Sequence, residues 1–168
     1  MDIIIRLASP ADAGDMARVL MAAWSAAYQD IIPAAFIQRR NAQRAEQFQQ
    51  IITDENDSYY VVQASGKTAG YLRIVDAPAD EVLGAADVEQ IYFHPDYWRQ
   101  GLGTRAMAFA QEFARASGKT TMTIWVLAQN TSAIGFYETC GFAADGTRKT
   151  YDYGKPLDLI RMRKALSP

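Results

Sequence analysis

The stretch YWRQGLGTRA, residues 97–106, decides the predicted fold because it joins a strand-like segment to a long segment with helical periodicity. Two glycines, Gly101 and Gly103, stand one residue apart at the start of the expected helix. Glycine reaches φ > 0 and lets another group approach the backbone, so the pair fits a tight strand-to-helix turn. It also fits a phosphate site, since free N–H groups and the positive end of the helix dipole meet there.

The flanking segments predict a strand–helix–strand unit. DVEQIYFHP (87–95) is typical of a strand that Pro95 ends, and residues 101–118 form a helix that Gly118 closes. TTMTIWVLA (120–128) is rich in β-branched residues and predicts the next strand. Such a crossover is right-handed and its strands are parallel, and a parallel pair that splays near its ends can pair its backbone with an amide-bearing ligand.

Farther out, the chain predicts alternating helices and strands. IIIRLA (3–8) is a strand, and Ser9, Pro10 and Asp12 then signal a helix whose buried stripe runs from Met16 to Ala27. The other predicted elements are helical turns over 33–52, a hairpin over 58–76, a short helix over 130–141, and strands over 142–153 and 156–166. This order predicts an α/β (α+β) layered fold with a mixed sheet and helices on both faces, as a single domain over residues 1–168.

The composition excludes several classes of partner and site. The formal net charge of −2 gives no basic surface for nucleic acid or an anionic membrane, and no apolar run is long enough to span a bilayer. Cys140 is the only cysteine and His94 the only histidine, so we expect no disulfide framework and no thiolate zinc site. We expect a cytoplasmic protein that needs no metal. His94, before Pro95, is typical of a strand end near solvent.

The glycine spacing differs from two well-known nucleotide-binding motifs. Ala106 stands where the dinucleotide-binding fingerprint has its third glycine, and the motif does not follow a first strand. No Gly-Lys-Ser/Thr sequence stands at the P-loop spacing after Gly101 or Gly103 either, so the stretch is not a P-loop.

Two longer segments resemble the signature segments of the GNAT family of acyl-CoA-dependent N-acyltransferases. They are IYFHPDYWRQGLGTRAMAFA (91–110), in which Trp98 stands at the usual Gln/Arg position, and NTSAIGFYETCGF (130–142). The resemblance covers nearly the whole order of elements. It implies a three-layer fold whose mostly antiparallel seven-stranded sheet splays between two parallel central strands, and an acetyl-CoA-dependent N-acetyltransferase without a metal.

The resemblance also implies the residues that bind coenzyme A. The pyrophosphate would meet backbone N–H groups between Arg99 and Thr104, and the pantetheine arm would pair with a bulged strand end and with the second segment. In the family the tyrosine of that segment protonates the departing thiolate; here Tyr137 is alternatively a core residue, and Asn130 an ordinary helix cap. The implied contacts are Ile91, Tyr92, Phe93, Arg99, Gln100, Gly101, Leu102, Gly103, Thr104, Asn130, Ala133, Phe136 and Tyr137.

Amide formation requires a neutral amine, so a group must accept a proton. Glu89, or Asp87 two residues before it, is the expected base, directly or through water; both are alternatively ordinary solvated acids. The backbone N–H of Ile91 would stabilise the developing oxyanion.

The acceptor is expected to be a small-molecule primary amine. In this fold its site lies opposite the coenzyme, where the sequence offers Trp24, Tyr28, Ile32, Phe36 and Tyr151, several of which would be core. Two alternatives stay open: a non-catalytic acyl-CoA sensor or interaction module, and a protein N-terminal acetyltransferase. Many relatives pair through sheet edges, so a homodimer is also expected.

Overall fold

The computed structural model describes residues 1–54 and 58–167, apart from the side chain of Asp54. Its strands form one seven-stranded sheet in the order β1-β2-β3-β4-β5-β7-β6, with β4 and β5 parallel, which confirms the predicted mixed sheet. The strands are β1 (Ile3–Leu7), β2 (Tyr59–Ala64), β3 (Lys67–Asp76), β4 (Ala86–Phe93), β5 (Thr121–Leu127), β6 (Ala143–Asp152) and β7 (Pro156–Ala165). The helices are α1 (Ala13–Ala27), α2 (Ala34–Asn41), α3 (Arg44–Asp54), α4 (Leu102–Ala116) and α5 (Thr131–Thr139), with 3-10 turns η1 (Pro10–Asp12) and η3 (Pro95–Tyr97).

By their contacts the described residues divide into two compact units. The first contains Met1–Arg73 and Gln90–Ala106, and the second contains Ile74–Glu89 and everything from Met107 onward. Each unit is described below by itself, and the expectation of a single domain over residues 1–168 stays a prediction.

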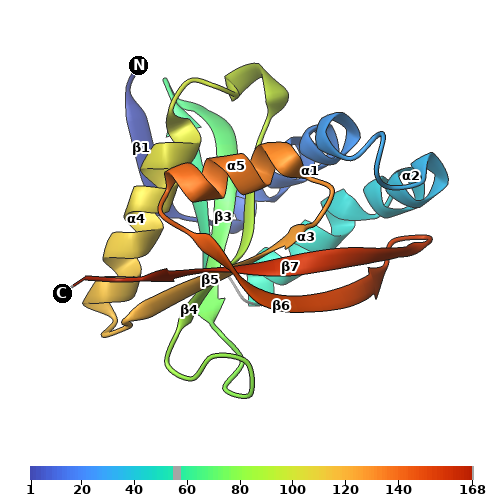
Figure 1. Cartoon of the computed structure of the whole chain (residues 1–168). Coiled ribbons are helices and arrows are strands. Elements are labelled where there is room, and N and C mark those ends of the chain that lie inside the picture. Colours follow the sequence, from blue (N-terminus) through green and yellow to red (C-terminus); the bar gives the residue numbers. More distant parts are fainter. Residues whose placement is uncertain (55–57, 168) are drawn as a thin grey trace. The chain divides into compact units, whose positions relative to one another are not determined.

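In the first unit, α1 packs against α3 (Figure 1). Met16, Val19 and Leu20 of the predicted stripe are completely or almost completely buried. Residues three and four positions apart share one face of a helix, so the stripe forms a single buried face. The β2–β3 hairpin turns at Ser65 and Gly66, which both have positive φ (48° and 78°), as two-residue hairpin turns that match the strand twist require.

In the second unit, β7 pairs with the whole of β5 through Leu159–Ala165, and it forms a long antiparallel hairpin with β6 (Figure 1). The core here is made of Met122, Ile124 and Met162 from β5 and β7, together with Ala110 and Ala114 of α4. The β4–β5 ladder consists of two Cα pairs, Ala86↔Met122 and Asp87↔Thr123. Val88 and Glu89 continue β4 beyond it, in agreement with the predicted splay of the parallel strands.

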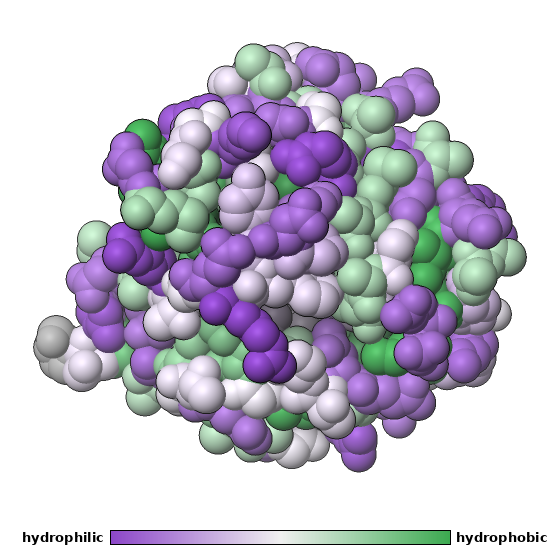
Figure 2. All heavy atoms as spheres, turned by 90° about the horizontal axis from the view of Figure 1, so that it is seen from above, coloured by the Kyte–Doolittle hydropathy of each residue, from purple (hydrophilic) through white to green (hydrophobic). Residues whose placement is uncertain are grey.

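Figure 2 shows hydrophilic side chains interspersed with smaller hydrophobic areas on the face seen from above. Within residues 1–54 and 58–167, no helix combines the length and hydropathy needed to cross a bilayer. The same residues contain no group of three His, Cys, Asp or Glu side chains able to hold a metal ion.

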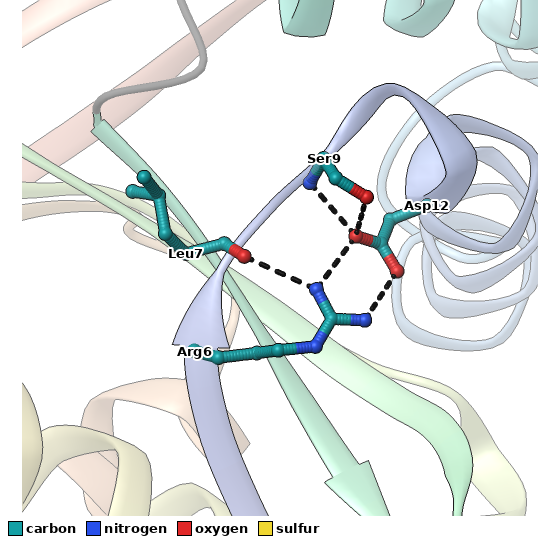
Figure 3. A network of polar contacts seen from close by, with 4 residues as sticks. All are labelled: Arg6, Leu7, Ser9 and Asp12. Carbon is teal, nitrogen blue, oxygen red and sulfur yellow. Dashed lines mark hydrogen bonds and ion pairs between the residues drawn. The ribbon is translucent and has the colours of Figure 1, made fainter.

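A charged network fixes the turn between β1 and α1 (Figure 3). Arg6 donates two hydrogen bonds of 2.8 Å to the two carboxylate oxygens of Asp12, and a third bond of 3.1 Å to the Leu7 carbonyl. The Asp12 carboxylate also accepts from the backbone N–H and the hydroxyl of Ser9, so it closes the predicted N-terminal cap. The Arg6 guanidinium, aided by both Ser9 bonds, holds the pKa of Asp12 below its ordinary value.

Arg6→Gln is expected to lower the free energy of unfolding at pH 7 by about 1–2 kcal/mol, the lower range for charge-assisted hydrogen bonds because Arg6 is 40% exposed. A lowered carboxyl pKa stabilises the fold above the unfolded value of 3.8, so the loss should shrink as the pH falls through that value. Urea unfolding at pH 7 and pH 3 measures both. Glu112→Gln, which breaks the exposed pair with Arg115, is the control and should change little. An unchanged loss at pH 3 would contradict the assignment.

Gly70 is a point of close backbone approach in the first unit. A Cβ at this position would collide with the Phe93 ring and would lie 2.7 Å from the carbonyl oxygen of Tyr92. Since one of these atoms belongs to the backbone, it cannot move aside without distorting β4. Glycine at position 70 therefore allows Phe93 to lie directly over β3.

Gly70→Ala is expected to destabilise the protein by about 1–3 kcal/mol, the usual cost of forcing extra volume into a packed site. Thermal and urea unfolding measure it. Gly14→Ala is the matched control, because a Cβ there meets no described atom within 4 Å and alanine favours the helix. Gly14→Ala should be neutral or slightly stabilising, and equal losses in both variants would refute the close approach.

Candidate functional site

The predicted phosphate loop connects β4 to α4 inside the first unit. After β4 ends at Phe93, η3 forms and the loop is then fastened to its own backbone by two side chains. The Trp98 indole N–H donates to the Phe93 carbonyl at 2.8 Å, and the Gln100 side chain donates to the Asp96 carbonyl at 2.8 Å. These two side chains thus tie the predicted loop to its own backbone.

Two residues of this loop adopt left-handed backbone conformations. Gly101 has φ 80°, the conformation that the sequence analysis assigned to glycine, and Arg99 has φ 59°. A non-glycine residue in this region costs roughly 1–2 kcal/mol, which marks the Arg99 backbone as strained. A Cβ built at Gly101 meets no described atom within 4 Å, so the backbone conformation, rather than a crowded protein surface, requires glycine there. Gly103 lies within α4 and has no positive φ.

The start of α4 presents unpaired backbone donors. The first helical hydrogen bond runs from the Arg105 N–H to the Gly101 carbonyl at 3.2 Å. The N–H groups of the three residues before Arg105 have no carbonyl partner within the helix, as at every helix start. With the helix dipole behind them they suit an anion such as a pyrophosphate. Gly101 and Thr104 are exposed beside them, whereas the Leu102 side chain is core.

The spacing of two hydrogen bonds indicates a bulge in β4. Ala69 accepts from the His94 N–H at 2.9 Å, and Ala85 accepts from the Ala77 N–H at 2.9 Å. Eight positions separate Ala69 from Ala77 along β3, but nine separate Ala85 from His94 along β4. The extra residue on β4 is what a single β-bulge produces. Ile91, Tyr92 and Phe93, the predicted pantetheine contacts, lie in this part of β4 and are half-buried.

In the second unit, Asn130 caps α5, as predicted. Its side-chain oxygen accepts from the Ala133 N–H at 3.2 Å. Tyr137 is 8% exposed, and its ring packs against Phe136 and Phe142 with centroids 5.4 and 6.4 Å away. The structure thus brings Asn130, Ala133, Phe136 and Tyr137 onto one short helix; their contacts to coenzyme, and the role of Tyr137 as an acid, stay predictions.

The two acids named as candidate bases lie in different surroundings. Glu89 is exposed, whereas Asp87 is 8% exposed and its carboxylate accepts from the Thr123 hydroxyl at 2.5 Å. Burial raises the pKa of Asp87 to about 6, the hydrogen bond from Thr123 opposes this shift, and the negative charge of Glu89 adds to it. An acid that titrates near neutral pH and is mostly ionised at pH 7 is suited to accept a proton. The sequence favours Glu89 over Asp87 as the base, and no motif in it indicates the hydrogen bond from Thr123 to Asp87.

The predicted acceptor residues of the first unit form an aromatic group at the end of α1. Trp24 is buried and its ring meets that of Tyr28 edge-on, 5.2 Å between centroids. Ile32 is 2% exposed and belongs to the core, whereas Tyr28 and Phe36 are half-buried. Tyr151, on β6 of the second unit, is exposed, and the centroid of its ring lies 4.9 Å from that of the Tyr153 ring. A role for each in acceptor binding stays a prediction.

Comparison with known proteins gives consistent matches. The sequence model of the acetyltransferase (GNAT) family matches residues 22–142. The peptidyl-lysine N-acetyltransferase YjaB of Salmonella typhimurium (strain LT2) is 29% identical over 125 residues, 73% of this chain and 76% of that protein. The ribosomal protein bS18-alanine N-acetyltransferase of Escherichia coli (strain K12) is 33% identical over 87 residues, 52% and 55% of the two chains. The uncharacterized N-acetyltransferase MJ1207 of Methanocaldococcus jannaschii is 29% identical over 100 residues, 56% and 43%. The chain thus spans about half the length of several curated relatives it matches.

Solved structures share the fold. The PaiA N-acetyltransferase from Thermoplasma acidophilum, in complex with coenzyme A, superposes with a TM-score of 0.78 at 19% identity over 98% of this chain and 99% of that one. The E. coli ribosomal-protein-S18-alanine N-acetyltransferase has a TM-score of 0.65 at 22% identity over 99% and 96%. The family match to residues 22–142 confirms the resemblance seen in the sequence: the chain belongs to the acetyltransferase (GNAT) family.

Proposed function

We propose that the chain transfers the acetyl group of acetyl-CoA to the primary amine of a small molecule, by direct attack in a ternary complex. The observation that carries the proposal is the start of α4, where unpaired N–H groups follow the left-handed Gly101 directly after β4. This arrangement suits the pyrophosphate of a coenzyme. Structures of this fold have been determined with coenzyme A and with acetyl-CoA, which supports the same donor.

Each part of the proposed reaction has a residue of suitable chemistry. The loop from Arg99 to Thr104 would hold the pyrophosphate, and β4 from Ile91 to Phe93 would pair with the amides of the pantetheine arm. Acetyl-CoA supplies an activated acyl group as its thioester. Tyr137 would return a proton to the leaving thiolate.

We propose Asp87, rather than the exposed Glu89, as the group that accepts the proton of the acceptor amine, directly or through water. Asp87 is buried, hydrogen-bonded to Thr123, and ionised at neutral pH while remaining basic enough to take a proton. Glu89 would then act on Asp87 electrostatically, by raising its pKa.

A protein acceptor is the second candidate, because two of the matched relatives are named for peptidyl-lysine and for an alanine of a ribosomal protein. A peptide acceptor needs an open groove. Of the predicted acceptor residues in the first unit, Trp24 and Ile32 are buried and Tyr28 and Phe36 half-buried, so these side chains offer little open surface to a peptide, which supports a small molecule. The cytoplasmic location and the homodimer stay predictions.

The transfer is tested by mixing the purified protein with acetyl-CoA and a panel of small amines and peptides, and by measuring free thiol and acetylated product. The expected result is thiol release with small amines and little with peptides. Release with peptides alone would favour the second candidate. Coenzyme binding without any release, unchanged in Tyr137→Phe, would indicate a sensor; neither binding by calorimetry nor release would refute the proposal.

The role of Asp87 predicts a pH profile. In the wild type, kcat/KM should rise with pH through about 6 as Asp87 ionises. Thr123→Val should move this rise to higher pH, because the hydrogen bond that lowers the Asp87 pKa is lost, and Glu89→Gln should move it slightly lower. Asp87→Asn should reduce kcat by roughly 10²–10⁴-fold, the usual contribution of a general base.

A stability measurement serves as the control for Asp87→Asn. A carboxyl pKa raised in the folded state means that ionised Asp87 destabilises the fold above pH 6, by at most about 3 kcal/mol for a shift of this size. The variant should therefore gain stability over the wild type at pH 8 and lose that advantage near pH 4. A variant that is stable and retains both the full rate and the rise near pH 6 would exclude Asp87 as the base.

A further inference from the structure

Arg44, the first residue of α3, is a buried cation without a counter-ion. Arg44 is 7% exposed, and its Nε and Nη2 atoms have no hydrogen-bond partner in the part of the chain that the structure describes. Among the described residues no carboxylate forms an ion pair with it. A guanidinium cannot lose its proton in a protein, so the charge stays in place although its burial is unfavourable.

The surroundings of Arg44 hold the guanidinium but do not satisfy its donors. Its Cζ atom lies 4.4 Å from the centre of the Trp24 ring, a cation–π contact that stabilises the charge without accepting a hydrogen bond. Tyr71 and Tyr92 are close enough to act on its charge, and their rings lie 5.9 Å apart. Tyr71 donates its hydroxyl hydrogen to the Gln90 side chain at 2.9 Å, which fixes its orientation. We refer to Arg44, Trp24, Tyr71 and Tyr92 as the Arg44 site.

A second arginine strengthens the case for an anion. Arg40, in the last turn of α2, also has a buried Nε without a hydrogen-bond partner. Burial lowers the pKa of the Arg44 guanidinium, and the positive charge of Arg40 lowers it further, so the two cations repel each other. An anion bound at Arg44 would supply the missing acceptor and would offset this repulsion.

Two of the four residues of the Arg44 site, Trp24 and Tyr92, are already assigned to the proposed reaction. Trp24 is one of the predicted acceptor residues, and Tyr92 belongs to the segment of β4 predicted to pair with the pantetheine arm. All four residues of the site belong to the first unit. An anion held here would therefore be part of the acceptor, next to the strand that presents the thioester.

We propose that Arg44 binds a carboxylate of the acceptor, so that the substrate is an amine that carries a carboxylate, as an amino acid does. This inference rests on the proposed acetyl transfer. A carboxylate matches the planar fork of the guanidinium and carries the one negative charge that neutralises it. Peptide N-termini and lysine side chains lack this adjacent carboxylate.

The kinetic test compares amines that differ only in the carboxylate: phenylalanine, leucine and glutamate against their α-carboxamides and their decarboxylated amines. In the wild type, kcat/KM should be about 10–100-fold higher for the carboxylates, the range of a charge-assisted hydrogen bond. Arg44→Gln should raise KM for the amino acids by a similar factor and leave kcat for the decarboxylated amines within about twofold. Arg44→Lys should restore part of the affinity. Arg163→Gln, an exposed arginine on β7, is the control and should change neither.

A binding test separates failure of this inference from failure of the acetyl transfer. Acetate or phenylacetate, titrated against the coenzyme-free protein in chloride-free buffer, should raise the unfolding temperature of the wild type and of Arg163→Gln but not of Arg44→Gln. If Arg44→Gln is poorly folded, the wild-type preference for carboxylates still decides the matter. Equal rates with amino acids and their decarboxylated amines, or equal stabilisation of all variants by carboxylates, would overturn the inference while leaving the transfer intact. Absence of thiol release with every amine would refute the transfer, and the carboxylate titration would then test Arg44 alone.

Discussion

The structure depends on a backbone that leaves its hydrogen bonds unmade where β4 passes into α4. The parallel ladder between β4 and β5 has two residue pairs. The first N–H groups of α4 have no carbonyl within the helix to which they could donate a hydrogen bond. Such a backbone must be held in place by other means. Trp98 and Gln100 do so by hydrogen bonds to carbonyls of Phe93 and Asp96, while Arg99 and Gly101 take left-handed conformations. The loop is thus tied to its own backbone and still has N–H donors at the start of α4.

Trp98 shows how one departure from the family pattern is accommodated. A Gln or Arg at this position offers polar donors, whereas the indole has a single N–H, and here that N–H is bonded to the end of β4. Its ring is 42% exposed beside the loop. Trp98 therefore contributes to the geometry of the loop, and its indole N–H is already used within the protein.

Most of the fold was predictable from the sequence because its signals are local. Asn130 caps α5, Gly118 and Gly141 follow helix ends with positive φ, and the α1 stripe is buried as its spacing predicts. The properties of Gly70, Asp87 and Arg44 depend on residues distant in the chain. Gly70 is needed because of Phe93, Asp87 is buried against Thr123, and Arg44 is enclosed by α1, β3 and β4. No periodicity or motif around these three residues indicates such contacts.

The contrast among the charged groups indicates which of them serve the fold. Asp12 is almost fully buried, yet each of its oxygens accepts from Arg6, and Arg161 is likewise paired with Asp145 at 2.6 Å. These pairs are complete without a ligand. The Asp87 carboxylate accepts a hydrogen bond from the neutral Thr123 hydroxyl. The Arg44 guanidinium lies over the Trp24 ring instead of beside a hydrogen-bond acceptor. Replacing either by a neutral side chain would remove a desolvation cost, so stability alone does not explain them. Each group, within its own unit, has instead the chemistry of a ligand site: a buried guanidinium interacts favourably with a carboxylate, and a buried carboxylate interacts favourably with an amine.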